Sequence, residues 1–80
     1  MAKYAVTFQI KYNDPDTVHS VYPDINGNNF MVFEANDMEE ARILAYQKLN
    51  NDWAFMYPYD EDFFVKTKKY HWVEYVPQED

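Results

Sequence analysis

Apolar and polar residues alternate along Tyr4–Tyr12, near the start of the chain. Apolar side chains occupy the even positions of this stretch, whereas the odd positions from Ala5 to Lys11 carry small or polar side chains. A period of two is typical of a β-strand with one buried face and one solvent-exposed face. We therefore predict a strand over Tyr4–Tyr12 at the centre of a sheet, with the other elements covering its even-numbered side chains.

Turn-forming residues divide the following segment into two further predicted strands. Asn13–Asp16 combines a proline with Asn and Asp, which favours a chain reversal before a second strand over Thr17–Tyr22. Asn26-Gly27 holds the only glycine and is the pair preferred in a type I′ hairpin turn, where both residues need φ > 0. The third strand is predicted over Asn29–Ala35. Its apolar residues occupy both faces, so the pattern does not decide which face is buried.

Capping residues at 36–40 predict a helix. Asp37 precedes Glu40 by three positions, which is the spacing of a capping box. The helix is predicted to end at Asn50–Asp52, where short polar side chains compete for backbone groups. One apolar stripe recurs at helical spacing and should face the core: Met38, Ala41, Leu44, Ala45 and Leu49.

The last third of the chain is harder to assign. Trp53–Tyr59 is compatible with a short strand, a helical turn or an aromatic loop. Asp60–Asp62 is predicted to be an acidic turn. Phe63–Val76 is predicted to be the final strand region, strongest over its β-forming residues Tyr70–Val76 and bent or bulged at its lysines. Residues 78–80 are predicted to form a solvated tail.

This element order, β-β-β-α-β, predicts one α+β domain spanning residues 1–80. We expect two layers: an antiparallel-rich four-stranded sheet and one helix on one face. The last strand should pair beside Tyr4–Tyr12 and make that strand central. Because one helix covers only one face, the other face should be partly open. An alternative function follows, in which the protein forms a homodimer through its sheet.

The charge of the chain favours a protein partner over nucleic acid. Fourteen acidic and seven basic residues give a net charge of −7. Such a charge opposes direct binding to DNA or RNA, which requires Lys and Arg at the phosphates. It suits a partner with a basic surface, or it serves solubility alone. Rows of carboxylates can also imitate DNA phosphates, so a DNA mimic is one form of this function.

The predicted partner-binding surface centres on three consecutive carboxylates between aromatic residues. Exposed aromatic rings supply contact area, while Asp and Glu steer toward and pair with basic groups. The other interpretation is a solvated turn whose aromatic side chains point into the core. The predicted contact residues are Tyr57, Tyr59, Asp60, Glu61, Asp62 and Phe63, with Asp14 and Asp16 as electrostatic support.

The residues needed for catalysis or metal binding are scarce. There is no Cys, the only histidines are His19 and His71, and no acidic segment matches a calcium-binding loop. Ser20 follows His19 in a predicted strand, so their side chains should point to opposite faces and cannot form a nucleophile–base pair. We therefore expect no enzymatic activity, no metal and no cofactor.

Three lysines with neighbouring aromatic residues form the only basic cluster. Lys66, Lys68 and Lys69 precede Tyr70 and Trp72. Cationic grooves with stacking platforms bind single-stranded nucleic acid, but lysines also protect an edge strand from aggregation. The net charge favours the second interpretation.

One stretch, Val32–Arg42, resembles a strand-to-helix passage of small phage and bacterial α+β proteins, in which a strand ends at Ala-x-Asp/Ser and a helix opens with Glu-Glu-Ala. The chain as a whole is short, Cys-free and rich in Tyr and Asp. In this it is similar to small acidic proteins that phages make to disable host enzymes or defence systems. The resemblance implies an inhibitor acting in the host cytoplasm. In agreement, we expect neither a signal peptide nor a membrane span.

Overall fold

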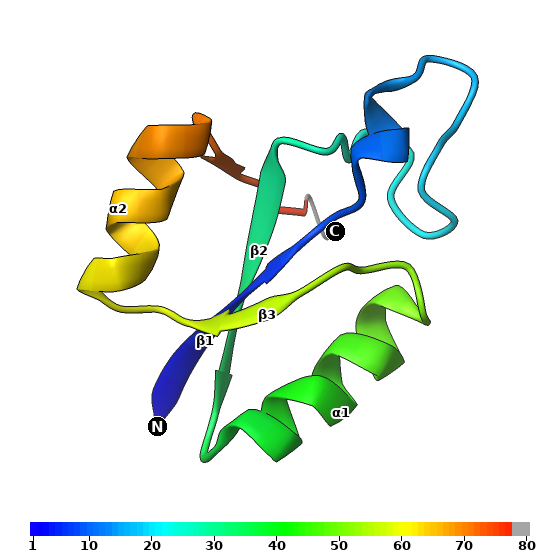
Figure 1. Cartoon of the computed structure of the whole chain (residues 1–80). Coiled ribbons are helices and arrows are strands. Elements are labelled where there is room, and N and C mark those ends of the chain that lie inside the picture. The colour runs from blue at the N-terminus through cyan, green and yellow to red at the C-terminus, as the bar shows by residue number, and fades with distance from the viewer. Residues whose placement is uncertain (78–80) are drawn as a thin grey trace.

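A computed structural model describes residues 1–77 and contains a four-stranded mixed sheet with two helices (Figure 1). The α+β class is confirmed, but the predicted layout with one helix is wrong. The predicted tail at 78–80 lies outside the described residues. The elements in chain order are β1 (Ala2–Thr7), η1 (Ile10–Asn13), β2 (Asn29–Ala35), α1 (Met38–Leu49), β3 (Met56–Pro58), α2 (Glu61–Tyr70) and β4 (Val73–Glu74).

The sheet has the strand order β3-β1-β2-β4. β1 pairs antiparallel with β2 and with β3, and Ala5 lies opposite both Val32 and Tyr57. β4 pairs in parallel with β2, with Val73 opposite Asn29. β1 is therefore an inner strand, as predicted. Its second neighbour is nevertheless β3, and the last strand lies at the far edge of the sheet.

The predicted second strand, Thr17–Tyr22, is a loop around a buried histidine. His19 is 1% exposed, and its Nδ1 accepts hydrogen bonds from the backbone N–H groups of Val21 (3.1 Å) and Tyr22 (3.2 Å). Those N–H groups bind the imidazole ring, so they are not available to a strand ladder. β1 is also shorter than predicted, because the chain turns into η1 at Ile10.

Gly27 allows a close approach of two backbone segments. It does not form the predicted type I′ hairpin, since its φ is not positive. The turn spans residues 26–29, and the Asn29 N–H donates to the Asn26 carbonyl at 3.1 Å. A Cβ atom on Gly27 would lie 2.9 Å from the Ile10 Cα and 3.1 Å from the Gln9 carbonyl oxygen. Position 27 therefore requires glycine because there is no room for a side chain.

Gly27→Ala is expected to lower the free energy of unfolding by about 1–3 kcal/mol, because the new methyl group overlaps backbone atoms that cannot rotate away. Urea denaturation of the variant and wild type measures this change. The matched control is Asn28→Ala, an exposed neighbour whose loss should cost less than about 0.5 kcal/mol. Equal denaturation midpoints for Gly27→Ala and wild type would contradict the expectation.

The predicted helix α1 is confirmed at both ends. The Asp37 carboxylate accepts the N–H of Glu40 at 2.8 Å, and Asn50 follows the last turn with φ 57°. Three residues of the predicted stripe are buried and place the helix close to the sheet: Ala41, Ala45 and Leu49. Small side chains at the centre of the stripe permit this close packing.

Most of the predicted final strand is the second helix, α2. The Asp60 carboxylate accepts the N–H of Phe63 at 3.1 Å, so the predicted acidic turn is a helix N-cap. Acidic residues fill the first turn, and Lys68 and Lys69 lie in the last, which matches both ends of the helix dipole. His71, in the left-handed conformation with φ 57°, ends the helix, and the predicted bend at the lysines is absent.

Helices cover both faces of the sheet (Figure 1). On the side of α1 the core contains Val6, Phe8, Tyr12, Ile25, Met31, Phe33, Ala45 and Leu49. On the side of α2 it contains Ala5, Phe30 and Phe63, flanked by Val32, Tyr57, Tyr59 and Trp72. The apolar residues on both faces of β2 are thus explained. The second helix lies on the face that was expected to have none, so that face is more covered than predicted, although a cavity remains between α2 and the end of β1.

Candidate functional site

The N-terminal turn of α2 holds the three predicted carboxylates, and they are not equivalent. Asp60 caps the helix through its bond to the N–H of Phe63. Glu61 and Asp62 are exposed in the first turn. Within residues 1–77, neither forms an ion pair or a side-chain hydrogen bond. Glu61 and Asp62 are therefore free to meet a partner, whereas Asp60 has a structural task.

The aromatic residues beside these carboxylates divide between core and surface. Phe63 is 1% exposed and packs edge-to-face on Phe30, with ring centroids 5.0 Å apart, so it belongs to the core. Phe64, which was not among the predicted contact residues, is 42% exposed. Its ring packs edge-to-face on Tyr59, with ring centroids 4.9 Å apart. Tyr57 and Tyr59 are half-buried. The exposed aromatic contact at this end of α2 is thus Phe64 on Tyr59.

Asp14 and Asp16 lie in a separate part of the molecule. Both are exposed in the loop after η1, and the Asp14 carboxylate accepts the N–H of Asp16 at 2.9 Å. In Figure 1 this loop and α2 lie on opposite sides of the view. The structure does not bring these two residues together with the carboxylates of α2.

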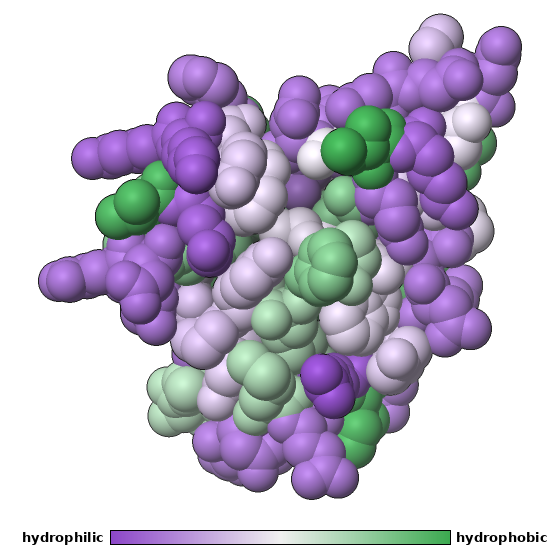
Figure 2. Space-filling model, in the orientation of Figure 1, coloured by the Kyte–Doolittle hydropathy of each residue, from purple (hydrophilic) through white to green (hydrophobic). Residues whose placement is uncertain are grey.

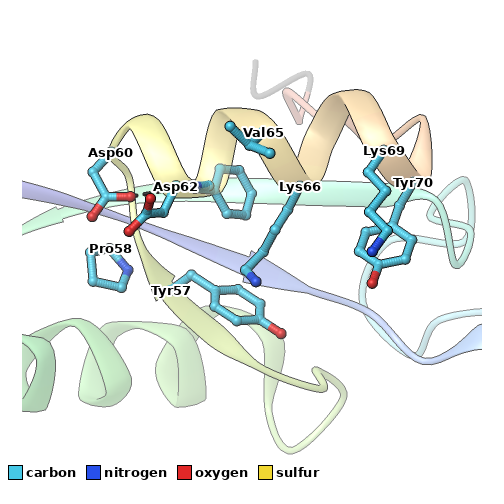
Figure 3. Close-up of a pocket in the computed structure, with 9 residues that line it drawn as sticks. Tyr57, Pro58, Asp60, Asp62, Val65, Lys66, Lys69 and Tyr70 are labelled. Carbon is cyan, nitrogen blue, oxygen red and sulfur yellow. Dashed lines mark hydrogen bonds between the residues drawn. The ribbon is translucent and has the colours of Figure 1, made fainter.

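A hollow of ≈ 620 Å³ runs between α2 and β3 (Figure 3). Acidic residues line the end nearest the start of the helix, and lysines line the end nearest its last turn. The Lys66 ammonium lies 5.7 Å from the Tyr57 ring centroid, and the Lys69 ammonium lies 5.4 Å from that of Tyr70. The residues around the hollow are Tyr57, Pro58, Asp60, Asp62, Phe63, Val65, Lys66, Lys69 and Tyr70.

The surface over β3 is apolar. Figure 2 shows green and pale atoms between the two helices, with hydrophilic atoms on either side. Phe55, immediately before β3, is 65% exposed. The outer edge of β3 itself has few free donors. The bonds from Thr7 N–H to Phe55 O and from Tyr59 N–H to Lys3 O turn residues 55 and 59 toward β1, leaving the proline of β3 on the outer edge.

Lys66, Lys69 and Tyr70 on the wall of this hollow were not among the predicted contact residues. Their spacings of three and four positions place them on one helix face. The predicted strand hid this, because alternation would have separated Lys66 from Lys69. The capping aspartate and the acid-to-base order along residues 60–69 were the signals that favoured a helix.

Ser20, His19 and Asp52 also lie close together, in an arrangement that serves structure. Since the His19 Nδ1 accepts two backbone bonds, the Nε2 carries the proton and donates to the Asp52 carbonyl oxygen at 2.7 Å. The Ser20 hydroxyl donates to the Asp52 carboxylate. The rings of Phe8 and Tyr12 pack on the imidazole, each at 5.4 Å between centroids. In this geometry the Ser20 hydroxyl is hydrogen-bonded to a carboxylate, and both imidazole nitrogens of His19 are hydrogen-bonded to backbone groups. The imidazole therefore does not contact the hydroxyl as a base would.

The hydrogen bond from Ser20 holds the pKa of Asp52 below its usual value, against the opposing effect of partial burial. Because the folded-state pKa is the lower one, ionised Asp52 stabilises the fold above its unfolded-state pKa. That contribution is lost as the pH falls through the folded-state pKa. Burial, with the Asp52 charge, raises the pKa of Tyr12.

Within residues 1–77, no cluster of three or more His, Asp or Glu side chains is arranged to hold a metal ion. Over the same residues, no helix has the length and apolar content to cross a membrane. Comparison with protein-family models, curated proteins and solved structures gives no significant match.

Proposed function

We propose that this protein is a non-enzymatic binding protein that covers a basic surface of a protein partner with the N-terminal turn of α2. The observation that carries the proposal is the exposed Phe64, packed on Tyr59 beside the unpaired carboxylates of Glu61 and Asp62. We refer to Tyr59, Glu61, Asp62 and Phe64 as the α2 patch.

The α2 patch combines the two features that interfaces use. A ring supported by another ring loses little conformational freedom on binding, so its apolar area contributes efficiently to affinity. Carboxylates at the rim raise the association rate with a basic surface and select against acidic ones. The net charge of −7 adds a long-range attraction toward the same class of partner.

The resemblance to small acidic phage proteins supports an inhibitor that acts on a host protein in the cytoplasm. A mimic of a long phosphate row would need carboxylates that continue across one surface. The loop that carries Asp14 and Asp16 and the helix α2 lie on opposite sides of the view in Figure 1, so the local patch is the form of the function that we propose.

The test neutralises two charges at a time. Glu61→Gln with Asp62→Asn should weaken partner binding by roughly 3- to 30-fold, since two rim ion pairs contribute up to about 1 kcal/mol each. It should also flatten the salt dependence of affinity. The matched control, Asp14→Asn with Asp16→Asn, changes net charge equally and keeps the oxygen that accepts the Asp16 N–H.

The partner is first captured from lysate with wild-type protein, and its affinity for each variant is then measured by calorimetry at two salt concentrations. Loss of affinity in the α2 double variant alone supports the proposal. Equal losses in both double variants would show that bulk charge alone is responsible. Full affinity in the α2 double variant would rule out the α2 patch.

A further inference from the structure

A second cavity, of ≈ 560 Å³, adjoins the hollow under α2 and has no acidic residue in its lining. We call it the Lys66 cavity, because among residues 1–77 Lys66 is the only charged residue in its lining. The chain has fourteen acidic and seven basic residues, so the positive charge of this lining is opposite in sign to the net charge of the protein. Its lining is Thr7, Phe8, Gln9, Ile10, Gly27, Asn28, Ala54, Phe55, Tyr57, Lys66, Tyr70 and Trp72.

The cavity exists because α2 is anchored at one end. Phe63, in the first turn, is its only buried residue, and beyond it the helix leaves space above the end of β1. Tyr57 on β3 forms one wall. Tyr70 and Trp72 form another, stacked with ring centroids 5.2 Å apart and planes inclined by 27°. The site therefore has flat apolar walls.

Lys66 reaches from α2 toward Tyr57, as Figure 3 shows. It is half-buried, and within residues 1–77 no carboxylate forms an ion pair with it. An ammonium held over a ring has lost part of its hydration and gains strongly from a charge-assisted hydrogen bond to an anion. Lys69, one turn further along α2 and also without a carboxylate partner among those residues, lines the adjoining hollow and adds positive charge beside the cavity.

From these contacts we propose that the Lys66 cavity binds a small planar aromatic anion. The ring lies against Tyr57 and the Tyr70–Trp72 pair, and the carboxylate or phosphate of the ligand meets the Lys66 ammonium. Asp60 and Asp62 line the end of the adjoining hollow nearest the start of α2 and repel an anion at that end, which favours a position beside Lys66. The volume lies within the range of roughly 300–1,000 Å³ typical of small-molecule sites. This site is independent of the α2 patch.

The test titrates ¹⁵N-labelled protein with three naphthalene compounds: the 2-carboxylate, the neutral 2-carboxamide and the phosphate ester. The indole N–H signal of Trp72 reports the site, and that of Trp53, which does not line the cavity, is the internal control. The carboxylate should shift the Trp72 signal and bind at least about 10-fold more tightly than the carboxamide, as one charge-assisted hydrogen bond implies. Comparison of the carboxylate with the phosphate ester shows which of the two anionic groups the cavity prefers.

Lys66→Gln should remove this preference, so that carboxylate and carboxamide bind equally. Lys68→Gln removes the same charge from an exposed position of α2 outside both cavities and should keep it. The proposal is overturned if the wild type binds both compounds equally, if Lys66→Gln keeps the preference, or if the Trp72 signal does not move. Binding to the α2 patch affects none of these outcomes.

Discussion

Phe63→Ala is expected to lower the free energy of unfolding by about 3–5 kcal/mol, the range for truncating a fully buried phenylalanine. The ring is 1% exposed and packs against Phe30, Tyr57, Tyr59 and Trp72, with centroid distances of 5.0 to 5.9 Å. No other residue of α2 is buried. The variant should therefore lose the attachment of the helix as well as the area of the ring. A domain of 80 residues has little stability in reserve, so such a loss approaches global unfolding.

The adjacent residue provides the control for this variant. Phe64→Ala removes an identical side chain from a position that is 42% exposed, and we expect a loss below about 1 kcal/mol. Urea denaturation followed by circular dichroism measures both. Similar losses for the two variants would show that the assignment of Phe63 to the core and Phe64 to the surface is wrong.

His19→Leu is expected to cost about 3 kcal/mol or more, although leucine fills much of the same space. The substitution leaves the N–H groups of Val21 and Tyr22 and the carbonyl of Asp52 without their partner. These backbone groups are partly buried, so each one left unpaired costs about 1 kcal/mol, the lower end of the range for buried groups. The loop over residues 14–24 should become disordered, because its backbone N–H groups are held by hydrogen bonds to the imidazole ring.

Denaturation gives the cost, and the amide spectrum of the loop shows whether its order is lost. His71→Asn is the control, since asparagine tolerates the left-handed conformation at the end of α2 and His71 is exposed. If His19→Leu keeps wild-type stability and sharp loop signals, the hydrogen bonds of the imidazole do not hold the loop in place.

The sequence predicted elements that are specified by local chemistry. The Asp37 cap and the apolar stripe predicted α1, and the alternation from Tyr4 predicted the strand β1. These signals depend on neighbours within one turn or one strand, so the sequence displays them directly. The inner position of β1 was predicted from a pairing with the last strand, whereas its second neighbour is β3. The position of β4 depends on a crossover that places it in parallel beside β2, and no local pattern reports such a pairing.

Two failures have a shared cause. Phe64, Val65, Thr67 and Tyr70 are strand-forming residues, and their β propensity concealed the cap at Asp60 and the dipole-matched charges of α2. The segment Thr17–Tyr22 contains β-forming residues between turn-forming ones, yet a single buried ring organises it. In both cases tertiary contacts of one residue, Phe63 or His19, outweigh the propensity of its neighbours.

The sequence indicated which residue types form the candidate site, but not which of their side chains face outward. The carboxylates of Glu61 and Asp62 are exposed, as a contact surface requires. Which of Phe63 and Phe64 faces outward depends on the helical register, and a predicted strand cannot supply it. The Lys66 cavity depends on the same register and on a loop, Gln9 to Asn28, that closes its far end.

The anchoring of α2 by one buried side chain also has a consequence for motion. α1 is held by three buried residues, so its amide protons should exchange only when the whole domain unfolds. α2 should exchange through a partial opening that releases Phe63 alone. During each such opening, the side of β1 that bears Ala5 and Thr7 meets solvent. The half-covered sheet predicted from the alternation is then a short-lived, sparsely populated form of the native protein.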